Sequence, residues 1–130
     1  MTTHKIIKTE KAPTPVGPYN QGVTATGQII FVSGQIAIEV ETSEIVGTND
    51  VSKQTEQVMA NLKAILTEAE ANFSNVVKTT IYLKNMEDFT TVNDVYAKYF
   101  NPENAPARAC VEVARLPKDV LVEIDCIAVV

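Results

Sequence analysis

The chain has 130 residues, of which 45% are hydrophobic and 21% are charged, and its formal net charge is -5. This length and composition predict one folded domain, residues 1–130, that can bury a hydrophobic core. They exclude a transmembrane helix, because no apolar run approaches about 18 residues. The net negative charge and the scattered basic residues argue against general nucleic-acid binding.

The first ten residues, MTTHKIIKTE, do not contain the apolar segment of a secretory signal. The two cysteines, Cys110 and Cys126, have no paired spacing. Together these features predict a cytoplasmic protein with reduced thiols. No group of His and Cys residues has metal-ligand spacing, so the sequence predicts no metal site.

The N-terminal third predicts strands around one rigid loop. Residues 5–7, KII, suit a short strand, and residues 11–22, KAPTPVGPYNQG, predict an extended, turn-rich loop because they hold three prolines and two glycines. The β-branched segments VTATG and QIIFVSGQI follow, and they predict a hairpin whose turn is Thr26-Gly27. Residues 39–49 are polar and predict a loop with a short irregular strand.

The middle of the chain predicts two helices separated by a strand. Residues 49–71 have apolar side chains at helical spacing, and Asn49 or Asp50 can cap this helix. Residues 75–83, NVVKTTIYL, predict a strand. Residues 85–100 predict a second helix that Asn85 caps and Asn101-Pro102 ends. The apolar positions expected on the buried sides of these three elements are Val51, Val58, Leu62, Ile65, Leu66 and Ala69; Val77, Thr79, Ile81 and Leu83; and Met86, Phe89, Val92, Tyr96 and Tyr99.

The last 25 residues, PARACVEVARLPKDVLVEIDCIAVV, predict two strands joined by the turn RLPKD. The order β-β-β-α-β-α-β-β predicts an α+β fold with a single mixed or antiparallel sheet and two helices packed on one face. The opposite face is expected to be uncovered and too apolar for water alone, so we expect another subunit to cover it. The side chains expected on that face are Val76, Lys78, Thr80 and Tyr82 with Arg108, Cys110 and Glu112.

Two charged residues of the closing strands are candidates for chemistry. Arg108 stands between two alanines, and it is either an exposed edge arginine or a planar fork that binds a carboxylate. Glu123 is either a surface charge, including a salt bridge to Arg108, or a carboxylate that orients water or carries protons. The sequence pattern alone leaves both alternatives open.

The two thiols are weaker candidates. Cys110 is either a small buried hydrophobe or part of a site, but the sole histidine, His4, is expected in an N-terminal tail, so a Cys-His nucleophile is not predicted. Alternation along the strands places Arg108, Cys110 and Glu123 on the outer face of the sheet and Cys126 in the core. The two thiols would then lie on opposite faces and cannot form a disulfide.

Four further residues have both a structural and a functional reading. Asn93 borders the apolar stripe of the second helix, as a satisfied boundary amide or as part of a site. Tyr19 lies in the rigid loop, where it either packs or lines a pocket. Ser33 stands beside Gly34 at the end of a hydrophobic strand, where a ligand or a backbone segment can approach closely.

The segments GPYNQG, FVSGQI, VVKTTIYLKNMEDFTTVNDVY and PARACVEVARLPKDVLVEI occur in one order along the chain. In order and spacing they resemble the RidA (YjgF) family of reactive-intermediate deaminases, from about Thr9 to Val129. The resemblance implies a chorismate-mutase-like α+β fold, assembled as a homotrimer. In such a trimer the sheets form a central barrel, the helices lie outside, and the sites lie between subunits.

The resemblance also implies a 2-iminobutanoate/2-iminopropanoate deaminase. Such an enzyme hydrolyses reactive imines and enamines, for example 2-aminoacrylate released by serine or threonine dehydratases, to 2-oxo acids and ammonia. No metal or organic cofactor is implied. This chemistry needs a carboxylate anchor, a placed water and a proton carrier, but no strong nucleophile.

Carried over to this chain, the resemblance makes Arg108 the carboxylate anchor and Glu123 the residue that positions the attacking water. Cys110 would contribute backbone contacts and pocket shape. The remaining positions that match residues lining or supporting the pocket are Tyr19, Ser33, Gly34 and Asn93. One departure is Glu70, which stands where the family usually has glycine after the first helix, and Asn72 is expected to adopt the left-handed conformation instead.

Two other functions stay open from the sequence. A non-enzymatic trimer that binds small carboxylates such as 2-oxo acids, and regulates a partner, would use the same arginine fork; saturable binding without turnover would identify it. Ribonuclease activity is a third reading, and the acidic charge disfavours it.

Overall fold

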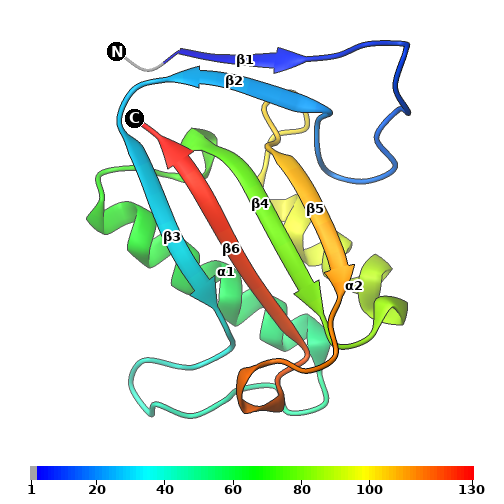
Figure 1. Cartoon of the computed structure of the whole chain (residues 1–130). Helices are drawn as coiled ribbons and strands as arrows, with labels where there is room; N and C mark the ends of the chain where they lie inside the picture. Colours follow the sequence, from blue (N-terminus) through cyan, green and yellow to red (C-terminus); the bar gives the residue numbers. More distant parts are fainter. Residues whose placement is uncertain (1–2) are drawn as a thin grey trace.

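The computed structural model describes residues 3–130. Its elements in chain order are β1 (Thr3–Ile7), β2 (Gly22–Thr26), β3 (Ile29–Gln35), α1 (Val51–Glu68), β4 (Val76–Leu83), α2 (Phe89–Tyr96), β5 (Ala107–Glu112) and β6 (Val122–Val129). Four strands form one sheet in the order β3-β6-β4-β5, in which β4 and β5 are parallel and the other pairs antiparallel. Both helices lie on one face of this sheet (Figure 1), which confirms the predicted α+β arrangement.

The predicted single sheet is wrong, because β1 and β2 form a separate two-stranded antiparallel sheet. The hairpin predicted at Thr26-Gly27 is also absent. Gly27 has a φ of 146° and turns the chain so that Gln28 exchanges backbone hydrogen bonds with Val130, at 2.6 and 2.9 Å. Strand β3 therefore pairs with β6 instead of β2. His4, expected in a tail, lies in β1 opposite Ala25.

The hairpin predicted at RLPKD is wrong as well, because β4 lies between β5 and β6 (Figure 1). Residues 113–121 pass around the end of β4, where they bond to its backbone. The Val113 N–H donates to the carbonyl of Leu83 at 2.9 Å, and the Lys84 N–H donates to the carbonyl of Leu121 at 3.1 Å. The strand of Arg108 and the strand of Glu123 are consequently not neighbours.

The helix starts follow the predicted caps. The Asp50 side chain accepts a hydrogen bond from the Lys53 N–H at the start of α1, and the Asn85 side chain accepts one from the Glu87 N–H. The second predicted helix, 85–100, is split into α2 with a short 3-10 turn on either side. After α1, Glu70 itself adopts the left-handed conformation with φ 59°, whereas Asn72 is extended and caps a 3-10 turn.

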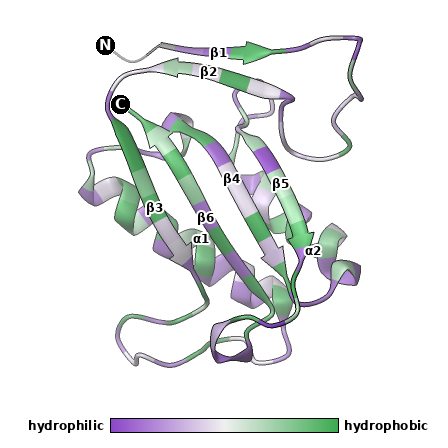
Figure 2. Ribbon diagram, viewed as in Figure 1, coloured by the Kyte–Doolittle hydropathy of each residue, from purple (hydrophilic) through white to green (hydrophobic). Residues whose placement is uncertain are grey.

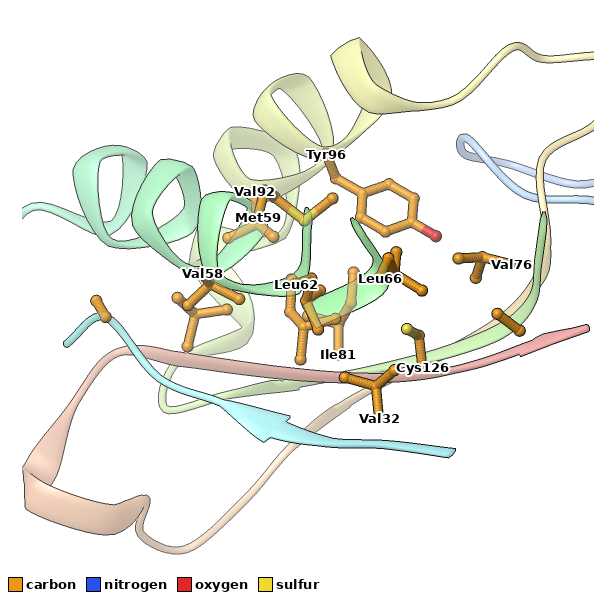
Figure 3. Close-up of a cluster of buried hydrophobic side chains, with 14 of the residues drawn as sticks. Val32, Val58, Met59, Leu62, Leu66, Val76, Ile81, Val92, Tyr96 and Cys126 are labelled. Atoms are coloured by element: carbon orange, nitrogen blue, oxygen red, sulfur yellow. The ribbon is translucent and has the colours of Figure 1, made fainter. Parts of the chain in front are cut away.

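The core lies between the helices and the sheet. Figure 3 shows side chains of α1 and α2 meeting those of β3, β4 and β6. Burial of each large apolar side chain contributes roughly 1.5–3 kcal/mol to folding. The labelled members of this cluster are Val32, Val58, Met59, Leu62, Leu66, Val76, Ile81, Val92, Tyr96 and Cys126.

The face of the sheet away from the helices is uncovered, as predicted, and we call it the open face. Hydrophobic residues run along the first half of β3 (Figure 2), and Phe31 is 76% exposed there. Val76, predicted on the open face, is 1% exposed and belongs to the core, because the register shifts between Val76 and Lys78. Within residues 3–130, no helix combines the length and apolarity needed to cross a bilayer.

Candidate functional site

Arg108 lies on the helix side of the sheet, not on the open face as predicted. Strand β5 runs parallel to β4, with Arg108 in register with the buried Thr79, so both side chains leave the sheet on the same side. The Arg108 guanidinium reaches α2, where Nη1 donates a hydrogen bond to Oδ1 of Asn93 at 2.6 Å. Asn93, which the resemblance assigns to the residues lining or supporting the pocket, therefore contacts the guanidinium of Arg108.

Three aromatic rings surround the guanidinium. The Cζ atom of Arg108 lies 5.1 Å from the ring centroid of Tyr19, 5.6 Å from that of Phe89 and 5.2 Å from that of Tyr96. Phe89, Asn93 and Tyr96 occupy positions i, i+4 and i+7 of α2, so one helix face supplies two rings and the amide. We call these five residues the Arg108 cluster.

The sequence pattern assigns Phe89 and Tyr96 only to the apolar stripe of the helix. Their spacing of four and three residues from Asn93 is the sequence feature that could have indicated that the two rings lie on the same helix face as the amide. Gly17 was missed as well: a Cβ added there would lie 3.1 Å from Nη2 of Arg108, so the loop backbone packs against the guanidinium.

Arg108 has no carboxylate partner among residues 3–130. The ion pairs formed among residues 3–130 are Lys98–Glu56 and Arg115–Asp119, both exposed. Burial lowers the pKa of Arg108, but a guanidinium remains protonated at neutral pH. A half-buried cation without an anion is costly, and binding an anion would compensate that cost. The cluster is therefore suited to a small carboxylate.

Asn20, which sequence reasoning also missed, fixes the Tyr19 loop to the strand of Arg108. Asn20 is 6% exposed, and its Nδ2 donates to the carbonyl of Ala105 at 2.7 Å. Its backbone N–H donates to the carbonyl of Pro106 at 3.1 Å. These bonds place Tyr19 next to Arg108 although the two residues are far apart in sequence. An amide side chain within a proline-rich loop is the sequence feature that could have indicated a residue that hydrogen-bonds the loop to a neighbouring segment.

Glu123 lies on the open face, where its neighbours are Gly34 and Asp125. Between Val32 and Gln35 the register of β3 shifts, so Ser33 and Gly34 together oppose Asp125 of β6. A Cβ added to Gly34 would clash with the Glu123 carboxylate, so the carboxylate packs directly on the glycine backbone. Ser33 is exposed in the same bulge. We call Ser33, Gly34 and Glu123 the Glu123 cluster.

The pKa of Glu123 is raised, first by burial and then by the charge of Asp125. Asp125 accepts a hydrogen bond from the hydroxyl of Tyr82 at 3.1 Å. Tyr82 is also the cross-strand partner of Glu123 in β4. A carboxylate with a raised pKa holds a proton more readily than an ordinary glutamate, which suits a group that accepts and returns protons.

Cys110 lies on the same side of β5 as Arg108, half-buried, and packs against the core. Burial raises the pKa of its thiol, so it stays protonated and is a weak nucleophile. Cys126 is in the core as predicted, and both thiols are free. The prediction that they lie on opposite faces is wrong: both face the helices, with β4 between their strands.

The part of the chain that the structure describes has no group of three or more His, Cys, Asp or Glu placed to hold a metal ion. One chain instead presents two separate clusters. Tyr19, Asn93 and Arg108 come together on the helix side, whereas Gly34 and Glu123 meet on the open face. The predicted arrangement of Arg108, Cys110 and Glu123 on one face is therefore wrong for a single chain.

Residues 9–130 match the family described as endoribonuclease L-PSP. The chain belongs to this family, also called YjgF/RidA. Among its relatives, a RutC family protein of Synechocystis is 58% identical over 98% of this chain and 97% of the relative. The 2-iminobutanoate/2-iminopropanoate deaminase of Salmonella typhimurium is 48% identical over 96% of this chain and 97% of the relative.

Solved structures of YjgF/RidA proteins have the same fold. The crystal structure of E. coli TdcF with bound serine superposes with a TM-score of 0.73 at 44% identity, covering 97% of this chain and 98% of that one. The YjgF gene product of E. coli superposes with a TM-score of 0.72 at 48% identity, covering 96% and 98%.

Proposed function

We propose that this chain is an imine/enamine deaminase of the 2-iminobutanoate/2-iminopropanoate class, which hydrolyses intermediates such as 2-aminoacrylate to 2-oxo acids and ammonia. The observation that carries the proposal is Arg108, a half-buried guanidinium without a carboxylate partner in the part of the chain that the structure describes. The deaminase name of relatives at 48% and 49% identity supports the same reaction. The two free thiols suit a cytoplasmic location.

The proposed reaction uses few protein groups. The enamine takes a proton on carbon to form an iminium, whose C2 is electrophilic without further activation. Arg108 holds the carboxylate, and Glu123 accepts a proton from water as the water oxygen bonds to C2. The same proton then passes to the nitrogen. Ammonia leaves as the C2 hydroxyl gives its proton to Glu123 and the carbonyl forms, and this proton replaces the one that the enamine carbon took from solvent. Water is consumed and no redox partner or cofactor is needed.

Because Arg108 and Glu123 lie on opposite sides of the sheet, this reaction requires two copies of the chain. We place the site between subunits of a homotrimer, where the Glu123 cluster of one chain completes the Arg108 cluster of its neighbour. The exposed apolar side chains of the open face, including Ile29, Phe31 and Val111, support such an assembly. Packing these open faces together would bury them.

The proposal is tested by generating 2-aminoacrylate in situ with a serine dehydratase and following its disappearance. The wild type is expected to accelerate the decay, and Arg108→Ala to lower kcat/KM by roughly 100-fold, because it removes the carboxylate anchor. Arg115→Ala is the matched control, since Arg115 is exposed and its ion pair is with the exposed Asp119, away from the Arg108 cluster. No acceleration by the wild type would refute the activity, and full activity of Arg108→Ala would refute the site.

A second candidate is a non-enzymatic binder of 2-oxo acids that regulates a partner. One observation favours it: the Arg108 cluster is assembled within one chain and needs no Glu123 to hold a carboxylate. Saturable binding of a 2-oxo acid that Arg108→Ala abolishes, without any turnover of 2-aminoacrylate, would support this function over the deaminase.

A further inference from the structure

We propose that Phe89 and Tyr96 are positioning residues for the carboxylate anchor: with Tyr19, their rings hold the Arg108 guanidinium in one orientation and leave its hydrogen-bond donors free. This inference rests on the proposed function, because it assumes that Arg108 binds the carboxylate of the substrate. The ring centroids lie 5.1–5.6 Å from Cζ of Arg108, within the range of cation–π contacts.

The rings compensate the charge without consuming donors. A guanidinium has five N–H donors, and an aromatic face attracts the cation without accepting a conventional hydrogen bond from it. Within residues 3–130 the guanidinium makes one side-chain hydrogen bond, from Nη1 to Asn93. A carboxylate partner would neutralise the charge, but it would occupy the same donors that the substrate needs. The aromatic cluster keeps them available for two parallel bonds to one carboxylate.

The two rings of α2 are themselves held in place. Tyr96 is 0% exposed, and its hydroxyl shares a 2.8 Å hydrogen bond with Oγ1 of Thr79 in β4. Burial raises the pKa of Tyr96 to about 12, so the phenol stays neutral and does not form an ion pair with Arg108. Phe89 is the first residue of α2 and packs against the core. The orientation of Arg108 thus depends on the docking of α2 onto β4.

The test compares Phe89→Leu with the wild type in affinity for 2-oxobutanoate, measured by titration calorimetry, and in KM and kcat for the dehydratase-generated imine. Removing one ring is expected to raise both Kd and KM roughly fivefold, the size of one cation–π contact, while kcat changes by less than about twofold. Phe89→Tyr keeps a ring and should restore both values. It therefore tests the role of the ring even if the leucine variant folds poorly. Phe73→Leu is the matched control, because Phe73 contacts Tyr99 and Phe100 instead of Arg108.

A spectroscopic readout separates orientation from general damage. The chain has two arginines, Arg108 and Arg115, so the Nε–H resonance of Arg108 can be assigned with Arg115→Lys. This resonance should show a ring-current shift in the wild type and in Phe73→Leu, and a smaller shift in Phe89→Leu. Tyr96→Phe keeps the ring but loses the bond to Thr79 that holds it in place, so the ring-current shift should fall and KM should rise, both by less than in Phe89→Leu.

The outcomes are distinguishable. If Phe89→Leu binds 2-oxobutanoate as tightly as the wild type, with an unchanged KM, the positioning role is overturned and the deaminase proposal stands. If the wild type neither binds 2-oxobutanoate nor hydrolyses the imine, the proposed function fails and the positioning role fails with it. If Phe73→Leu weakens binding as much as Phe89→Leu does, the effect is general destabilisation and the positioning role is likewise rejected.

Discussion

Arg108 and Glu123 project from opposite sides of the same sheet, with β4 between their strands. Arg108 is in register with the buried Thr79, whereas Glu123 is in register with Tyr82, which lies on the open face. The sheet itself separates the two side chains, so no change of rotamer can bring Arg108 and Glu123 of one chain into contact. Any reaction that uses both residues must therefore combine two copies of the chain.

This relationship predicts complementation between two inactive variants. Arg108→Ala and Glu123→Gln should each be inactive alone, but subunits mixed in equal amounts, unfolded and refolded together should recover activity. If each site takes its arginine from one chain and its glutamate from the next, about one site in four is intact in a random cyclic assembly. The dehydratase-coupled assay should then give about a quarter of the wild-type rate.

The control for this experiment is the double variant Arg108→Ala/Glu123→Gln mixed with the wild type. In that mixture about one site in four is again intact, so a similar rate shows that subunits exchange freely during refolding. If the mixed single variants remain inactive while the control gives about a quarter, and not half, of the wild-type rate, the two residues do not act in a shared site between chains.

Gly34 provides a second prediction, because the Glu123 carboxylate packs on its backbone. A Cβ at position 34 would clash with that carboxylate, so Gly34→Ala must displace Glu123. We expect kcat to fall by about 10- to 100-fold, since a misplacement of about 1 Å is enough to disrupt a positioned water. The affinity for 2-oxobutanoate should change little, because the Arg108 cluster that holds the carboxylate is assembled within one chain and does not include Gly34 or Glu123.

Gly22→Ala is the matched control for Gly34→Ala. A Cβ at position 22 would lie 3.4 Å from its nearest neighbour, Ile7, which is an ordinary contact. Its kcat should match the wild type. A Gly34→Ala enzyme with normal kcat would show that the placement of the Glu123 carboxylate against the glycine is unimportant for turnover.

Helices and individual strands could be predicted from the sequence because their signals are local. The spacing of Val58, Leu62 and Leu66 predicts a buried helix face, and these three residues are in the core. Caps are equally local, and Asp50 and Asn85 both accept the expected backbone hydrogen bonds. The 3.6-residue and two-residue periods report burial without knowledge of any distant partner.

Strand partners could not be predicted, since they depend on segments far apart in the sequence. The β5 strand pairs in parallel with β4, and this register turns Arg108 toward α2 instead of the open face. The sequence pattern of alternating residues is the same for either side of the sheet. The family resemblance assigned both Arg108 and Asn93 to the pocket, but their hydrogen bond and the contributions of Phe89 and Tyr96 required the structure.

Glu70 gives a stability prediction from its backbone conformation. It has φ 59°, a left-handed conformation that costs a residue with a side chain roughly 1–2 kcal/mol and that glycine adopts readily. Since glycine loses more entropy on folding, Glu70→Gly should raise the free energy of unfolding by about 1 kcal/mol. Urea unfolding at one fixed protein concentration measures this change.

The contrasting variant for Glu70→Gly is Glu68→Gly, at the last residue of α1. Glycine is a poor helix former, so this variant should lower the free energy of unfolding by up to about 1 kcal/mol. Equal destabilisation by both substitutions would contradict a left-handed conformation at position 70.

Asp125 should set the pH dependence of turnover through Glu123. Burial, and then the negative charge of Asp125, raise the pKa of Glu123. If Glu123 acts as a carboxylate, activity falls as the pH drops through this raised pKa. The acid limb of the pH–activity profile, where activity is lost on acidification, should therefore lie at higher pH than for an ordinary glutamate. Asp125→Asn removes one negative neighbour, and the acid limb of kcat should move to lower pH. It should still lie above the ordinary position, because the effect of burial remains.

Tyr82→Phe tests whether the charge or the hydrogen bond of Asp125 matters. It removes the 3.1 Å hydrogen bond to Asp125 but leaves the negative charge beside Glu123. Its acid limb should therefore stay near that of the wild type, while that of Asp125→Asn moves. An Asp125→Asn profile that is unchanged, or that moves to higher pH, would mean that the group titrating on the acid side is not Glu123.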